Sequence, residues 1–98
     1  MTINKTQDGS NLTIALEGRL DTTTAPQLEE ELKASLDNVT DLTLDFQQLE
    51  YISSAGLRVI LGAQKTMQKK GSMKVLHVNS DIMEVFDITG FSDILTIE

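Results

Sequence analysis

The sequence predicts an α/β fold in which helices pack against a single mixed β-sheet, in the order β-β-α-β-α-β-α-β. A weak strand candidate precedes the turn cluster Asp8–Asn11 and a clearly alternating segment follows it, which together suggest an antiparallel hairpin. After this hairpin, helical patterns alternate with apolar, strand-like runs. Such strand–helix–strand crossovers favour parallel neighbours and right-handed connections. We expect one domain over residues 1–98, because a chain of this length holds a single core.

The first half of the chain predicts three strands and one helix. The strands are expected over residues 3–7, 12–16 and 42–46. Gly18–Asp21 is the expected exit from the second strand. Thr24 as N-cap and Gln27 as its capping-box partner begin a helix whose leucines, four residues apart, share one face. This helix is expected to end near Asp37.

The second half predicts two helices and two strands. A long helix is expected over residues 54–70, a buried strand over 73–78, a short helix from about residue 80, and a last strand over 94–97. Gly71 is expected to be the C′ residue that follows the end of the long helix. Either Asn79 or Ser80 caps the short helix, and Gly90 ends it.

Composition limits the classes of function. The formal net charge is −7, with no run of Lys and Arg, which argues against binding to nucleic acid phosphates. The apolar runs are too short to cross a bilayer, and the first residues lack the apolar region of a signal peptide. There is no cysteine for disulfide or thiolate chemistry. We therefore expect a cytoplasmic protein, either a monomer or a weak dimer, with no cofactor.

Two serines precede the long helix and are the first candidates for a functional site. Ser53 and Ser54 stand directly before an apolar helical pattern, and Ser is a preferred N-cap. The amides of a first helical turn also favour an anion. From spacing alone, these serines either cap the helix or offer a hydroxyl at a position that tolerates a phosphate.

The stretch DFQQLEYISSAGLRVIL resembles the signature of the anti-sigma factor antagonists, the single-domain members of the STAS class. GRLDTTTAPQLEEEL resembles the turn and first helix of the same family, so the similarity covers essentially the whole chain. The resemblance implies a STAS-like fold and a phosphorylated serine. Aligned on Gly56 and Leu57, that serine is Ser54, whereas Ser53 stands where many members have Asp.

The resemblance also implies partners and a switch. In the family, the unphosphorylated protein binds an anti-sigma factor that is itself a serine kinase, and so releases a sigma factor. A separate serine phosphatase resets the switch. The residues expected to form the partner-binding surface are Asp21, Thr22, Ser53, Ala55, Gly56, Arg58, Gly62 and Lys65. Asp21 is implied to lie near the phosphorylated serine, although an ordinary turn Asp that bonds its own backbone is an equal alternative.

Several of these residues have a simpler interpretation. Arg58, Gly62 and Lys65 share one face of the long helix, which is either a solvated charged face or part of a docking surface. Gly56 is expected to keep the first turn accessible to a partner's active site. His77 is the only histidine, with no Cys beside it for a metal site, and is expected at a core or edge position.

No phosphate-binding loop motif is present, and no histidine is placed as a base for either serine. We therefore expect a binding module rather than an enzyme, with no catalytic residue and no metal. The alternative function is a non-phosphorylated STAS scaffold in a transport or sensory complex. The Ser53 replacement of the common Asp is what keeps that alternative open.

Overall fold

The computed structural model describes residues 1–98, and its centre is a four-stranded sheet in the order β1-β2-β3-β4. The strands are β1 (Thr2–Asp8), β2 (Asn11–Leu20), β3 (Asp41–Ile52) and β4 (Ser72–Leu76). β1 pairs antiparallel with β2, and β2, β3 and β4 run parallel. The predicted mixed sheet and its edge hairpin are confirmed.

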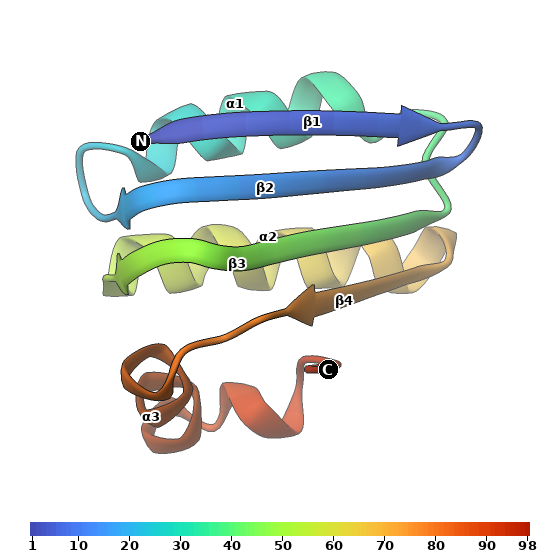
Figure 1. Cartoon of the computed structure of the whole chain (residues 1–98). Coiled ribbons are helices and arrows are strands. Elements are labelled where there is room, and N and C mark those ends of the chain that lie inside the picture. Colours follow the sequence, from blue (N-terminus) through green and yellow to red (C-terminus); the bar gives the residue numbers. More distant parts are fainter.

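Three helices complete the fold: α1 (Ala25–Ser35), α2 (Ser54–Lys70) and α3 (Ser80–Thr89). Figure 1 shows α1 and α2 on the same face of the sheet, while α3 lies beyond the edge formed by β4. Alternate residues of β2 and β3, such as Leu12, Ile14 and Leu44, are buried beneath α1 and α2. The other face of the sheet carries polar side chains, among them Thr13 and Asp45.

β3 is longer than expected, because it continues through Gln47–Glu50 to Ile52. Between Ala15 and Glu17 of β2 the register shifts, and it shifts again between Gly18 and Arg19. At each shift β3 holds one residue more than β2, so the pairing survives while the alternation of buried and exposed residues breaks. The expected end at Phe46 was therefore wrong, and Gly18–Leu20, expected as an exit turn, belongs to β2.

The expected capping box at the start of α1 is also wrong. Thr24 occupies the N-cap position but makes no capping hydrogen bond with its side chain. Its hydroxyl instead accepts from the Asp21 amide at 2.8 Å and donates to the Arg19 carbonyl at 2.7 Å. The Gln27 side chain, which was to complete the box, donates to the Met1 carbonyl at 3.4 Å. The Thr24 hydroxyl therefore bonds the turn that precedes the helix, and its side chain does not cap α1.

The C-terminal part departs from the expected last strand. A 3₁₀ turn, Phe91–Asp93, follows α3, and only a single bridge joins Ile97 to Val75. The sheet therefore has four strands rather than five. Phe86 anchors α3, since its ring lies 6.4 Å from the rings of both Phe46 and Phe91. Gly90 ends α3 with a positive φ of 82°, as predicted.

β4 ends at Leu76, two residues earlier than expected, because His77 has a positive φ of 59° and turns the chain away. The His77 side chain is exposed just past the end of β4, an edge strand, so of the two expected positions, core or edge, the core position is wrong. Its Nδ1 lies 2.9 Å from Oδ1 of Asp45 on the open face of the sheet. Burial raises the pKa of Asp45, but the His77 contact and the Gln47 amide outweigh it and leave this pKa below its ordinary value.

Candidate functional site

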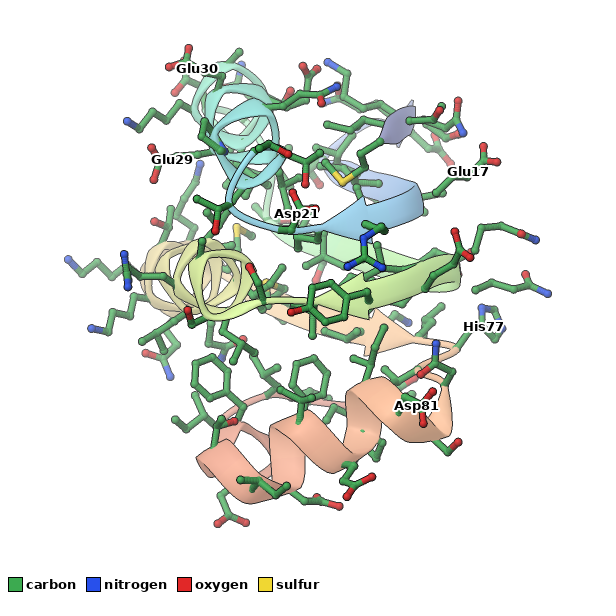
Figure 2. All side chains as sticks on the ribbon, turned by 90° about the vertical axis from the view of Figure 1, so that its left-hand side faces the viewer. Glu17, Asp21, Glu29, Glu30, His77 and Asp81 are labelled. Atoms are coloured by element: carbon green, nitrogen blue, oxygen red, sulfur yellow. The ribbon has the colours of Figure 1, made fainter.

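The candidate site lies at the end of the sheet where β2 and β3 finish side by side. Leu20 pairs with Ile52, and the Ser53 amide donates to the Leu20 carbonyl at 2.9 Å. This pairing joins the loop that leads into α1 to the turn that opens α2. The carboxyl ends of neighbouring parallel strands meet at one edge, where α/β sheets commonly bind their ligands. Figure 2 views this end of the molecule, with Asp21 beside the end of β2.

The two serines at the start of α2 have different surroundings. Ser53 is the N-cap, and its Oγ accepts from the Gly56 amide at 3.3 Å. Ser54 is the first helical residue, and its side chain is exposed. Asp and Ser are both good N-caps. Ser53 therefore fills the capping role that Asp would fill at this position, and the hydroxyl of Ser54 is left without that role.

Asp21 organises the loop between β2 and α1. Its Oδ1 accepts from the Thr23 amide at 3.0 Å, from the Thr23 hydroxyl at 2.8 Å and from the Thr24 amide at 3.2 Å. Led by the Thr23 hydroxyl, these bonds to the charged form lower the pKa of Asp21. Asp21 Oδ1 therefore accepts hydrogen bonds from the backbone of its own turn, as expected if Asp21 is an ordinary turn residue. No hydrogen bond joins Asp21 to Ser54.

Arg19 and Tyr51 lie one pair before this junction, and sequence reasoning did not single them out. The Arg19 guanidinium carbon is 4.3 Å from the centre of the Tyr51 ring, a cation–π contact. Arg19 Nε also lies 3.8 Å from Oδ2 of Asp21. Tyr51 is 42% exposed. It therefore presents a large, partly apolar side chain to solvent two positions before Ser53. Only the parallel register of β2 and β3 brings Arg19 over Tyr51.

Gly56 has a structural role that differs from the expected one. It is buried, and a Cβ at this position would lie 2.7 Å from Cγ of Leu20 and 2.9 Å from Cγ1 of Ile52. The glycine therefore allows the first turn of α2 to pack on the ends of β2 and β3. Gly56 is therefore a packing residue of this turn, and its expected role in keeping the turn accessible to a partner stays a prediction.

Four other predicted contact residues line two neighbouring grooves between α1 and α2. The smaller groove includes Thr22, Ala55 and Arg58, together with Glu29. The larger, of about 310 Å³, includes Arg58, Glu29 and Gly62. A Cβ on Gly62 would meet nothing within 4 Å. Lys65 is exposed but lines neither groove.

The arrangement can present a hydroxyl and a shaped surface to another protein. No group of three or more His, Cys, Asp or Glu side chains is placed to hold a metal ion. No helix of the structure combines the length and the apolar character needed to cross a membrane. What the site offers is an exposed nucleophilic oxygen at a helix start, flanked by the Asp21 loop, the Arg19–Tyr51 pair and the grooves.

Comparisons with known proteins give the same family as the motifs. The model of the STAS domain family matches residues 2–98. The anti-sigma-B factor antagonist of Bacillus subtilis is 32% identical over 92 residues, which are 93% of this chain and 84% of that protein. The anti-sigma-B factor antagonist of Listeria monocytogenes is 34% identical over 96 residues, covering 96% of this chain and 84% of its own.

Solved structures agree with the fold. SpoIIAA of Bacillus, an anti-sigma factor antagonist, superposes in its unphosphorylated form with a TM-score of 0.78 at 18% identity, covering 99% of this chain and 87% of its own. Its phosphorylated form gives the same TM-score at 19% identity, covering 99% and 91%. Fold, motifs and relatives therefore agree: the chain belongs to the STAS domain family, and it is similar over its length to the anti-sigma factor antagonists of that family.

Proposed function

We propose that this protein is an anti-sigma factor antagonist whose partner binding is switched by phosphorylation of Ser54. The proposal rests on one observation, which is that the two serines have different structural positions. Ser53 caps α2, and Ser54 exposes its hydroxyl at the start of the same helix. The similarity to named antagonists supports the role, and it does not favour the alternative of a non-phosphorylated scaffold.

The partner would be an anti-sigma factor that is also a serine kinase and brings its own ATP and Mg²⁺. In that reaction Ser54 Oγ would displace ADP from the γ-phosphorus of ATP and lose its proton to a base of the kinase. A serine phosphatase would restore the hydroxyl by hydrolysis. The chain itself would act by binding and not by catalysis, in the cytoplasm where a sigma factor works.

The physical basis of the switch is the charge that phosphorylation adds. A phosphate adds about −1.5 to −2 charges near neutral pH. At the start of α2 the helix dipole and the free amides of the first turn favour a negative group, so the fold tolerates it. In a complex that covers Ser54, the same phosphate is both a steric obstacle and a repelling charge. Phosphorylation would thus prevent partner binding and keep the fold intact.

The proposed partner surface surrounds Ser54. Thr22, Ala55 and Arg58 border the smaller groove beside it, and Arg58 and Gly62 continue along the larger one. Lys65 lies about one turn beyond Gly62 on the exposed side of α2. Ser53 and Asp21 would act indirectly, since one caps the helix and the other holds the loop. Gly56 would act through the packing of the first turn.

Peptide mapping tests the modification site directly. After incubation with ATP and the anti-sigma factor kinase encoded near this protein's gene, we expect one phosphate, on Ser54. Ser54→Ala should abolish its incorporation. Ser53→Ala should still accept phosphate, although loss of the cap should lower stability by about 0.5–2 kcal/mol. Phosphate on Ser53, or on the threonines of the Asp21 loop alone, would contradict the assignment.

Gly62 tests whether the groove between α1 and α2 belongs to the interface. Because a Cβ at Gly62 meets open space, Gly62→Ala should stabilise the free protein by up to about 1 kcal/mol through helix propensity. Gly62→Gln keeps good propensity but fills the groove. We expect a Gly62→Gln variant that is at least as stable as wild type and binds the kinase about tenfold more weakly, a loss of about 1.4 kcal/mol.

Isothermal titration with the purified kinase measures this effect, and Lys33→Gln is the matched control, since Lys33 borders the same groove from α1. Unchanged binding by Gly62→Gln would place the interface elsewhere. Equal weakening by both variants would show that binding responds to any substitution in this groove, and would contradict a specific role for the open space at Gly62.

A further inference from the structure

The negative charge of this protein is concentrated in its last quarter. The whole chain has 15 acidic and 8 basic residues, a formal charge of −7. Residues 75–98 contain no Lys or Arg, and their acidic residues are Asp81, Glu84, Asp87, Asp93 and Glu98. Five negative charges of the net seven therefore belong to α3 and the segment after it. The 74 residues before position 75 carry 10 acidic and 8 basic residues, so their charges are nearly in balance.

The outer face of α3 combines this charge with exposed apolar side chains. Ile82 and Phe86 point into the core. Asp81, Glu84 and Ile88 follow at i, i+3 and i+7, so they share another side of the helix. Ile88 is 77% exposed, and Ile94, just beyond the 3₁₀ turn, is 45% exposed. Figure 2 shows Asp81 on α3, at the opposite end of this view from Glu29 and Glu30 of α1.

Two features of this face are unfavourable in the isolated protein. Ile88 holds an apolar side chain in water, where burial would be favourable. Asp87 lies in the last turn of α3, where the helix dipole favours a cation, and that turn has no basic residue. None of Asp81, Glu84 and Asp87 forms an ion pair within the chain. A cation placed against Asp87 and an apolar group placed against Ile88 would relieve both.

We propose that the outer face of α3, with Ile94 beside it in sequence, docks a basic protein segment that carries an apolar side chain. The charge excludes the anionic alternatives, since nucleic acids and acidic lipid surfaces are repelled by Asp81, Glu84, Asp87 and Asp93, four carboxylates that form no ion pair within the chain. It also disfavours a second copy of this chain, which brings a net charge of −7. The inference is independent of Ser54 and goes beyond the switch proposed above.

A titration followed by amide NMR shifts tests the proposal on the intact protein. The probe is a short synthetic amphipathic helix of Leu and Lys, with the same peptide of Leu and Glu as its negative control. We expect shift changes over residues 80–98, weaker binding in high salt, and no binding of the acidic peptide. Ser54→Asp should leave the affinity unchanged, which separates this test from the switch.

Paired variants locate the contact. Asp81→Asn with Asp87→Asn, and separately Ile88→Ser, should each weaken binding of the Leu–Lys peptide by about tenfold. The matched control removes two charges from α1, by Glu29→Gln with Glu30→Gln, and should leave binding nearly unchanged. Asp87→Asn relieves the helix dipole, so the acidic variant should fold normally. Equal weakening by the α1 control, shift changes spread over the whole surface, or self-association seen by sedimentation would each overturn the proposal.

Discussion

Ser54→Asp is expected to weaken binding to the anti-sigma factor by about a hundredfold, a loss of about 2.7 kcal/mol, while the protein stays folded. Ser54 is exposed and caps nothing, so its replacement removes no internal hydrogen bond. A carboxylate in the first helical turn is mildly stabilising, by about 0.3–1 kcal/mol. In the complex, however, the same carboxylate would be buried without a partner cation. Thermal unfolding and isothermal titration measure the two effects separately.

Ser53→Asp is the matched control, because it adds the same charge one residue earlier. Asp is as good an N-cap as Ser, so the bond to the Gly56 amide should persist and the stability should hardly change. We expect this variant to bind nearly as well as wild type. If Ser53→Asp and Ser54→Asp weaken binding equally, total charge matters and the position of Ser54 does not. If Ser54→Asp binds unchanged, the switch proposal is wrong.

Gly56→Ala is expected to lower the free energy of unfolding by about 1–3 kcal/mol through overpacking. The added Cβ would meet Cγ of Leu20 at 2.7 Å and Cγ1 of Ile52 at 2.9 Å, both in the packed core. The backbone carbonyl of Leu20 lies at 3.0 Å as well, so the helix start itself has to move. The better helix propensity of Ala offsets up to about 1 kcal/mol of this loss.

The same substitution at Gly62 is the internal control, since it should be neutral or stabilising there. Urea unfolding of both variants measures the difference between a glycine required by packing and a glycine on a free helix face. Gly56→Ala should also reduce kinase binding, because it displaces the turn that carries Ser54. A Gly56→Ala variant as stable as wild type would contradict the packing described for this turn.

The elements with a clean periodicity were predicted well. The hairpin, the α2 helix from Ser54 to Lys70 and the Gly90 end of α3 follow from alternation, helical spacing and capping residues. The errors lie where tertiary pairing overrides the local pattern. β3 continues past Phe46 because two register shifts preserve its pairing with β2. The last strand is reduced to a single bridge between Ile97 and Val75, in which Val75 donates to the Thr96 carbonyl and accepts from the Glu98 amide.

For the candidate site, the sequence by itself determined that two serines open a helix, and the motif around them indicated the family. Only the tertiary structure decided which serine caps α2, since both Ser53 and Ser54 satisfy the preference for an N-cap. It also decided that Gly56 is a packing residue and that Arg19 lies over Tyr51. Those relations depend on the parallel register of β2 and β3, whose paired residues are thirty or more positions apart in the chain. A local pattern carries no information about a register between distant strands.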